Sequence, residues 1–399
     1  MKVLVINAGS SSLKYVLFEM STEKALLSGH IDGIGMERCV LKIKNASSSM
    51  EYAIKVKDHV DSIMVALRSL KEHKVIKEYS EISAIGHRVV HGGESYSKPT
   101  IITEPVIKKI EELSELAPLH NPANLAGIIA CKKILPKVPQ IAVFDTAFHQ
   151  TMEKEDYLYA LPQALYKKYK IRRYGFHGPS HKYVSEQAIK LLGKNEVTGA
   201  KASNDTKIIS CHLGNGASIT AIKNKKSVIN SMGFTPLEGL IMGTRSGDID
   251  PGLLFFLERK GFSINEMDGI LNKESGLLGI SGITSDVRDL QKQKLKGSKQ
   301  AKLALDMFAR KVAFYIGGYT ALLNGVDCIV FTAGIGEGGW FVRKPICDYL
   351  SHLGVKLDLN ANKSNQIIVS SPLSKVKVFV IPTNEELEIA RETNLLIGK

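Results

Sequence analysis

The sequence predicts an α/β protein built from two similar halves. A short run of small polar residues at 7–12 lies between two apolar segments, and the same arrangement returns at 207–222. In each copy a charged turn then leads into a third short apolar segment. Short apolar runs that are bounded by turn residues are typical of buried strands. Two copies of strand, small-residue loop, strand, turn and strand therefore indicate an internal duplication.

The loop of the first copy is a candidate phosphate-binding turn. We expect the strands of this copy at 3–6, 13–18 and 25–31. Gly9, Ser10 and Ser12 are small, so the backbone of the loop can approach a ligand closely and direct its N–H groups at an anion. Lys14 adds a positive charge just after the loop. An ordinary hairpin has the same pattern, so the loop alone leaves both interpretations open.

The rest of the first half alternates helical and strand patterns. We expect helices at 58–75, at 103–116 and after the rigid connection 118–124, and strands at 84–90 and 140–144. Arg88 lies within an apolar strand next to a glycine turn, where its charge is costly unless it meets an anion. A structural ion pair and an anion-binding site both explain it. Asp145 directly follows the next strand, at the end where ligands gather in open α/β sheets, and it is a candidate metal ligand, base or turn cap.

The second half repeats the strand pattern and adds long glycine-rich segments. We expect strands at 207–211, 219–222, 227–229 and 328–332, and helices from 179 and at 300–323. His177 and His181 have the spacing of a metal pair, but the glycine and proline between them disfavour a helix through His177. A catalytic role for His177 in its glycine loop is the better interpretation. The segment 231–252 carries Arg245 and is irregular, and long irregular loops in a domain are usually functional.

The final helix is expected at 384–397. Thr383 and Glu386 have the spacing of a capping box, which explains Glu386 and leaves Glu385 without a structural role. The glycine-rich segment 333–339 is expected to be a loop that follows the last buried strand. Neither a Walker A sequence nor the set of protein-kinase loops occurs in the chain.

Composition limits the classes of partner. The net charge is +13, but the lysines are scattered, and the dense cluster at 291–302 holds no aromatic residue for base stacking, so no nucleic-acid partner is expected. No apolar stretch is long enough to span a bilayer, and the N-terminus has no signal-peptide pattern, so no membrane partner is expected. The five cysteines are widely spaced without a C-x-x-C pair, which indicates neither disulfides nor zinc and favours the cytoplasm.

Taken together, these stretches resemble the acetokinase family. The matching segments extend over nearly the whole chain in order, at 7–14, 86–94, 119–124, 144–149, 174–181, 212–218, 232–252, 276–289, 332–337 and 383–387. That family belongs to the actin-like, sugar-kinase and heat-shock ATPase superfamily. The resemblance therefore implies an α/β fold of two duplicated actin-like (ribonuclease H-like) domains, with the active site in the cleft between them. It implies a first domain at 1–150, completed by the C-terminal helix 384–399, and a second at 151–383.

The resemblance also implies an activity. The expected reaction is the reversible transfer of a phosphoryl group from ATP to acetate, which gives acetyl phosphate and ADP. Mg²⁺, with Mn²⁺ as a possible substitute, would be the metal cofactor, and the protein would be a cytoplasmic homodimer. The alternatives are a propionate or butyrate kinase of the same family and a non-catalytic ATP-binding protein of the actin or chaperone kind.

The site residues implied by the resemblance lie in its matching segments. The catalytic group would be Asp145, His177, Arg245 and Arg88. Asn7 and Glu385 would hold the metal. The pocket for the acyl group would be formed by Arg88, Val90, Leu119, Phe176 and Pro236. The nucleotide would be bound by Lys14, Ser10, Ser12, His212, Leu213, Gly214, Asn215, Gly216, Asp286, Val287, Arg288, Gly334, Ile335, Gly336, Glu337 and Gly338. Gly338 is a departure, because the family commonly has asparagine there.

The chemistry of the implied reaction suits these residues. Acetate is already ionised near neutral pH, so it needs no general base before it attacks the γ-phosphorus. The enzyme must instead bring two anions together and neutralise the charge that spreads over the phosphoryl oxygens. Two arginines, a histidine and a metal ion suit that task. Asp145 is then better interpreted as orienting an arginine or a metal-bound water than as a base.

Overall fold

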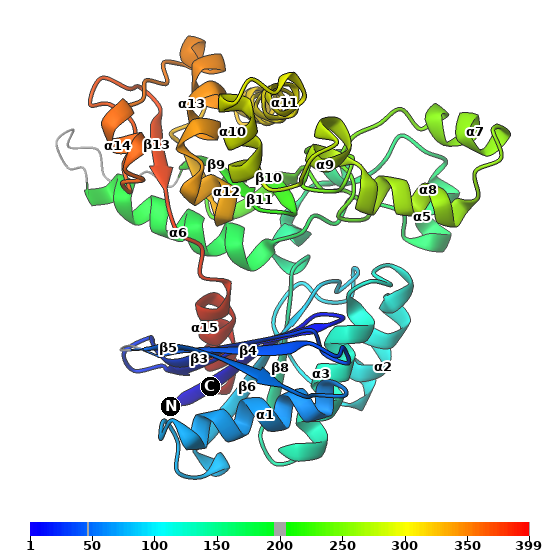
Figure 1. Cartoon of the computed structure of the whole chain (residues 1–399), viewed down its shortest axis with the longest axis vertical. Coiled ribbons are helices and arrows are strands. Elements are labelled where there is room, and N and C mark those ends of the chain that lie inside the picture. The colour runs from blue at the N-terminus through cyan, green and yellow to red at the C-terminus, as the bar shows by residue number, and fades with distance from the viewer. Residues whose placement is uncertain (46–47, 195–204, 399) are drawn as a thin grey trace. The chain divides into compact units, whose positions relative to one another are not determined.

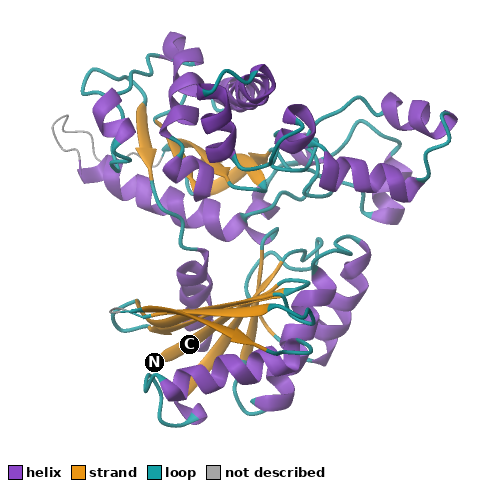
Figure 2. Cartoon of the chain, in the orientation of Figure 1, coloured by secondary structure: helices purple, strands orange, loops and turns teal. Residues whose placement is uncertain are grey.

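The computed structural model describes residues 1–45, 48–194 and 205–398, and the chain divides into two units. Unit 1 comprises Met1–Gln150 and Asn384–Lys399, and unit 2 comprises Thr151–Thr383. Lys399, which ends the predicted C-terminal helix segment, lies outside the described residues. Each unit contains one β-sheet with helices packed around it, as Figures 1 and 2 show.

The sheet of unit 1 has eight strands in the order β5-β4-β3-β2-β1-β6-β8-β7. The strands are β1 (Lys2–Ala8), β2 (Ser12–Glu19), β3 (Lys24–Asp32), β4 (Cys39–Lys44), β5 (Ser49–Ile54), β6 (Ile82–Val89), β7 (Thr100–Ile101) and β8 (Gln140–Phe144). The three strands predicted for the first repeat are all present. The sequence did not predict β4 and β5, because β4 alternates buried and exposed side chains and β5 is mostly exposed at the sheet edge.

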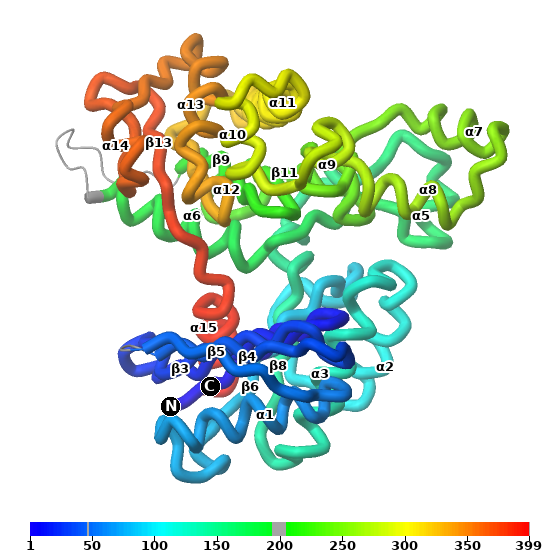
Figure 3. Tube along the Cα trace, in the orientation of Figure 1, coloured from blue at the N-terminus to red at the C-terminus, as the bar shows by residue number. Residues whose placement is uncertain are grey.

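Helices cover both faces of the unit 1 sheet. They are α1 (His59–Glu72), α2 (Glu104–Glu112), α3 (Asn121–Ile134) and α15 (Glu385–Ile397). A Cβ on Gly86 of β6 would lie 2.8 Å from Ile389 Cγ2, so α15 packs on the face to which Gly86 points. A Cβ on Gly127 of α3 would lie 2.9 Å from the Cβ of Ala8. Val5 of β1 pairs with Gly86, so these two residues point to the same face of the sheet. Side chains alternate along a strand, and Ala8 is three residues after Val5, so Ala8 points to the other face. The helix α3 therefore covers the face opposite α15. Figure 3 shows the C-terminal helix among the strands of the N-terminal unit.

The start of α15 differs from the predicted capping box. The N-cap residue is Asn384, whose side-chain oxygen accepts a hydrogen bond from the Leu387 N–H at 3.0 Å. The Thr383 hydroxyl instead lies 2.7 Å from the hydroxyl of Ser180, to which it is hydrogen-bonded. The capping-box prediction was therefore wrong, because a tertiary contact occupies the threonine and the next residue caps the helix.

The sheet of unit 2 repeats the order of unit 1. Its strands are β9 (Lys207–Leu213), β10 (Ala217–Lys223), β11 (Lys226–Asn230), β12 (Cys328–Thr332) and β13 (Lys377–Val380). Their order, β11-β10-β9-β12-β13, corresponds to β3-β2-β1-β6-β8 of unit 1. The directions also correspond, because β1 and β9 are each antiparallel to the strand after them and parallel to β6 and β12. The predicted duplication of an α/β fold is confirmed.

The helices of unit 2 pack on both sides of its sheet, with α6 on one side and α11 on the other (Figure 1). They are α4 (Lys154–Tyr157), α5 (Gln163–Tyr169), α6 (Gly178–Lys194), α7 (Gly252–Arg259), α8 (Ile264–Gly269), α9 (Gly276–Ser281), α10 (Val287–Leu295), α11 (Lys299–Leu322), α12 (Ala333–Gly338), α13 (Trp340–Tyr349) and α14 (Leu359–Lys363). No helix in the described ranges is both long and apolar enough to cross a membrane. The segment before α7 is irregular as predicted (Figure 2).

One glycine-rich segment was predicted wrongly. Residues 333–338 were expected to be a loop, but they form the short helix α12. Ala333 has a left-handed φ of 63°, and its N–H donates to Glu337 Oε1 at 2.9 Å. A side-chain carboxylate from the helix therefore satisfies a backbone donor at the helix start, which the glycine content of the sequence does not reveal.

Candidate active site

Three segments of unit 2 that the sequence selected converge beside Gly216. A Cβ on Gly216 would lie 3.4 Å from Arg245 Nη1 and 3.7 Å from His177 Nε2. These distances are those of ordinary van der Waals contact, so the guanidinium and the imidazole both lie directly beside the backbone of Gly216.

Arg245 lacks a carboxylate partner. Its Nη1 donates to the carbonyl oxygen of Pro236 at 3.2 Å, and in the described part of the chain Arg245 has no ion pair. The side chain is half-buried, and this burial lowers the pKa of Arg245. A guanidinium that is partly withdrawn from water without a counter-charge is suited to an anionic ligand.

His177 is held by a serine and by a second histidine. Its Nδ1 lies 2.9 Å from Ser218 Oγ, and its ring stacks on the ring of His212 with centroids 4.1 Å apart. His177 has a left-handed φ of 59° and directly precedes α6, which agrees with the predicted break before the helix. Such a backbone costs about 1–3 kcal/mol, so the surrounding contacts must maintain it.

The two histidines of this segment contact the same serine hydroxyl. His181 Nε2 is 2.7 Å from the same Ser218 hydroxyl that His177 contacts. Among the residues that the structure describes, no group of three potential metal-ligating side chains occurs.

A cavity of about 480 Å³ brings together the predicted nucleotide-binding segments of unit 2. This volume is typical of small-molecule sites. Its walls are Gly214, Asn215, Ser285, Asp286, Val287, Arg288, Gly334, Ile335, Gly338, Gly339 and Phe341. Sequence reasoning missed Ser285, Gly339 and Phe341 as lining residues. Ser285 and Gly339 are next to selected residues, whereas Phe341 had no signal of its own.

Several predicted nucleotide-binding residues also make contacts within the protein. Leu213 is fully buried in β9. The Glu337 carboxylate accepts hydrogen bonds from the N–H groups of Ala333 and Thr383, at 2.9 and 3.0 Å. Asp286 caps α10 through the Arg288 N–H, and its side-chain hydrogen bond with Arg288 lowers the pKa of Asp286 to about 2. Of these residues, Asp286 and Arg288 line the cavity.

The two hairpin loops use glycine amides to close their own turns. The Gly9 N–H donates to the Ser12 carbonyl oxygen at 2.8 Å, and the Gly214 N–H donates to the Gly216 carbonyl oxygen at 3.2 Å. The expectation that the loop N–H groups point at an anion was therefore wrong for Gly9. Lys14, which pairs with Asn7 across the hairpin of unit 1, is exposed and remains the charged group of that loop.

In unit 1 the predicted residues Arg88, Asp145 and Glu385 form an ion-pair cluster. Arg88 donates from Nε and Nη2 to the two oxygens of Asp145, at 2.9 and 2.7 Å. Arg88 Nη1 lies 3.3 Å from Glu385 Oε2. Burial lowers the pKa of Arg88, but the carboxylates of Asp145 and Glu385 outweigh it and raise the pKa above its ordinary value. Of the two explanations left open for Arg88, this structure contains the ion pair, and Asp145 orients the arginine.

The predicted acyl-pocket residues are divided between the units. Val90 and Leu119 belong to unit 1, whereas Phe176 and Pro236 belong to unit 2. Phe176 is buried, and Leu119 is exposed.

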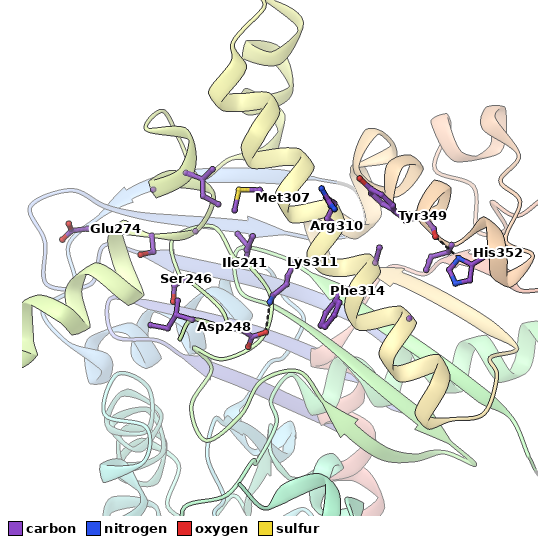
Figure 4. Close-up of a pocket in the computed structure, with 18 residues that line it drawn as sticks. Ile241, Ser246, Asp248, Glu274, Met307, Arg310, Lys311, Phe314, Tyr349 and His352 are labelled. Carbon is purple, nitrogen blue, oxygen red and sulfur yellow. Dashed lines mark hydrogen bonds and ion pairs between the residues drawn. The ribbon is translucent and has the colours of Figure 1, made fainter. Parts of the chain in front are cut away.

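A second cavity, of about 1080 Å³, lies in unit 2 and contains none of the predicted site residues. Figure 4 shows Lys311 directed toward Asp248, with which it forms an ion pair of 2.9 Å, and the ring of Phe314 beside them. The Phe314 side chain is 71% exposed. This cavity is lined mainly by α9, α11 and the loop after Arg245, so part of its wall comes from the segments 231–252 and 276–289 that the sequence selected.

The two sheets of matching strand order and the cavity between glycine-rich segments define a duplicated α/β protein with a site of small-molecule size. Comparison with known proteins gives the family. The sequence model of the acetokinase family matches residues 2–391. An acetate kinase from Thermotoga maritima is 52% identical over 409 residues, with 100% of this chain and 99% of that protein covered.

Solved structures agree with the sequence match. The crystal structure of an acetate kinase from Porphyromonas gingivalis has a TM-score of 0.92 and 44% identity, with 100% of both chains covered. That of a propionate kinase from Francisella tularensis has a TM-score of 0.92 and 42% identity, with 99% of both chains covered. The chain therefore belongs to the acetokinase family. It is an enzyme, a kinase that uses ATP as phosphoryl donor.

The Arg88–Asp145 ion pair should contribute more to the free energy of unfolding than an exposed ion pair does. Asp145→Ala should lower the free energy of unfolding by about 3 kcal/mol, because Arg88 would keep its charge at a largely buried site. Arg88→Met with Asp145→Ala should cost less than the sum of the two single changes. The exposed pair Lys344–Asp348 provides a control, and Asp348→Ala should cost no more than about 0.5 kcal/mol. Urea unfolding measures all four variants, and equal losses in Asp145→Ala and Asp348→Ala would contradict the assignment.

Proposed function

We propose that this protein catalyses the reversible transfer of a phosphoryl group between ATP and acetate, forming acetyl phosphate and ADP. The observation that carries the proposal is Arg245, which has no ion pair in the described residues and lies with His177 beside Gly216. Joining two anions requires cations at the phosphoryl oxygens. Acetate is ionised at neutral pH, so no general base is required.

The proposed roles follow from the chemistry of each side chain. Arg245 stabilises the transferring phosphoryl group, and His177 donates a hydrogen bond to one of its oxygens. Arg88, with its guanidinium oriented by Asp145, attracts the acetate carboxylate. The nucleotide occupies the 480 Å³ cavity, which is lined by three chain segments that contain predicted nucleotide-binding residues.

A divalent metal fits the residues at the start of α15 and the end of β1. Asn7 and Glu385 both belong to unit 1 and offer an amide oxygen and a carboxylate, the hard donors that Mg²⁺ and Mn²⁺ accept. When bound, the metal would neutralise charge on the phosphate oxygens of ATP. Glu385 also lies 3.3 Å from Arg88, so the same carboxylate orients the arginine. We also propose a cytoplasmic location, which agrees with five buried cysteines that are all free.

A second candidate function is the phosphorylation of propionate. It is favoured by the propionate kinase from Francisella tularensis, which is 42% identical with a TM-score of 0.92. One additional methylene changes binding in an apolar pocket by only about 1–3 kcal/mol. The 52% identity to acetate kinase relatives makes acetate our first choice.

The function is tested by trapping the acyl phosphate with hydroxylamine. The enzyme is incubated with ATP and Mg²⁺ and with acetate, propionate or butyrate, and each acyl hydroxamate is measured. We expect the highest kcat/KM with acetate and no product when Mg²⁺ is removed with a chelator. If no acetyl hydroxamate forms at saturating substrates, the proposed function is wrong, and a preference for propionate would favour the second candidate.

Arg245 is expected to contribute more to the transition state than to ATP binding. Removal of one such preorganised charge donor typically lowers turnover by about 10²–10³. Arg245→Ala should lose at least that much kcat with little change in ATP affinity. Arg245→Lys should recover only part of it, because an ammonium group lacks the forked geometry. Steady-state kinetics, direct ATP binding and a thermal melt test this, and a near-normal kcat in a folded Arg245→Ala enzyme would place the catalytic charge elsewhere.

We propose that the protein is a homodimer that associates through α7 and the surface around the larger cavity. The helix α7 has the sequence GLLFFLER, yet none of its residues is buried. Its Phe255 is 61% exposed, and Phe314 beside the larger cavity is 71% exposed. A second copy would cover apolar surface that a monomer leaves in water.

The dimer surface is tested by sedimentation at micromolar concentration. Phe255→Asp should shift the protein from dimer to monomer, because a carboxylate cannot be buried there without a partner. Leu373 is 80% exposed elsewhere in unit 2, and Leu373→Asp serves as the control that should remain dimeric. A monomeric wild type, or a dimeric Phe255→Asp variant, would contradict the proposed surface.

A further inference from the structure

A chain of hydrogen bonds connects His177 to the interior of unit 2. Ser218 Oγ lies 2.9 Å from His177 Nδ1 and 2.7 Å from His181 Nε2. His181 Nδ1 then lies 2.9 Å from Ser210 Oγ. Ser210, His181 and Ser218 are fully buried. None of these three residues has a role in the reaction as proposed above.

The proton count restricts how this chain can be arranged. A serine hydroxyl has one proton, so Ser218 can donate to only one of the two imidazoles and must accept from the other. A neutral imidazole has one N–H, so the direction at Ser218 decides which nitrogen of His177 carries its proton. If Ser218 donates to Nδ1, His177 presents an N–H at Nε2. If Ser218 accepts from Nδ1, His177 presents a bare Nε2, which can only accept.

We propose that Ser210, His181 and Ser218 are positioning residues that hold His177 with its proton on Nε2. This rests on the proposed function, because phosphoryl oxygens only accept hydrogen bonds and a Cβ on Gly216 would contact both His177 Nε2, at 3.7 Å, and Arg245 Nη1, at 3.4 Å. Ser210 then donates to His181 Nδ1, His181 Nε2 donates to Ser218, and Ser218 donates to His177 Nδ1. Every proton has one position, and both imidazoles are neutral.

Rigid elements support this arrangement. Ser210 is on β9 and pairs with Thr220 of β10, whereas Ser218 of β10 pairs with His212 of β9. Paired residues and residues two apart share a face, so both serines point to the same side of the sheet. The helix α6, which carries His181, packs against β9, and the His181 N–H donates to the His177 carbonyl oxygen at 3.0 Å. The orientation of His177 is therefore tied to the sheet and to the first turn of a helix.

The test combines kinetics with a direct measurement of the tautomer. In the wild-type enzyme, ¹⁵N NMR of labelled histidine should show His177 protonated at Nε2. Ser218→Ala should mix the tautomers and lower kcat about tenfold, with KM for ATP changed less than about twofold. His181→Gln keeps an N–H donor near the Nε2 position and should therefore retain most of the wild-type kcat. His181→Leu has no such donor, and its kcat should fall. Ser185 is a buried serine on the same helix that bonds only within it in the described structure, and Ser185→Ala should keep the wild-type kcat.

Two results would overturn the proposal. One is a wild-type His177 protonated at Nδ1, which would reverse the direction of the chain. The other is an equal loss of kcat in His181→Gln and His181→Leu at equal thermal stability, which would assign His181 to packing. If the wild-type enzyme forms no acyl phosphate, the proposed function fails instead, whereas the NMR measurement still reports the tautomer.

Discussion

The balance of charge around two arginines is the constraint on which the proposed chemistry depends. Arg88 on β6 is held by two carboxylates of its own unit, whereas Arg245 has no ion pair in the part of the chain that is described. A half-buried guanidinium without a counter-charge destabilises the ligand-free protein, and an anionic ligand relieves that cost. Unit 1 thus contains an arginine whose orientation is set by carboxylates, and unit 2 contains one that has no such partner in the described residues.

Duplication explains why the two halves share a framework and differ in chemistry. The hairpins β1–β2 and β9–β10 each close a tight turn with a glycine N–H, so that amide is not free for a phosphate. The hairpins differ in the side chains that they carry, which include Lys14 in unit 1 and His212 with Ser218 in unit 2. A common backbone can therefore hold different side-chain sets without a change in sheet order.

Secondary structure also determines how rigidly each proposed group is held. His177 has a strained backbone, but it is connected through Ser218 to a strand and through its own carbonyl oxygen to α6. Arg245 lies in an irregular segment and is fixed by fewer contacts, chiefly the Pro236 carbonyl oxygen. A histidine tied to the sheet therefore keeps its orientation more precisely than a side chain that is carried by a loop.

The sequence by itself determined the duplicated strand pattern, the long helix α11 and the irregular segment before α7, because these depend on short-range periodicity and on glycine content. It also selected the segments that line the smaller cavity, although their roles as binding residues stay predictions. It did not reveal β4 and β5, which lack an apolar run, or the cap of α15, where a contact with Ser180 occupies Thr383.

Only the tertiary structure decided which charges are paired. The sequence placed a cation in a strand at Arg88 and another in a loop at Arg245. Asp145, 57 residues further along the chain, meets the first, and no carboxylate meets the second among the described residues. Ion pairing depends on distances through space, and residues that are far apart in sequence come together only when the sheets and helices pack.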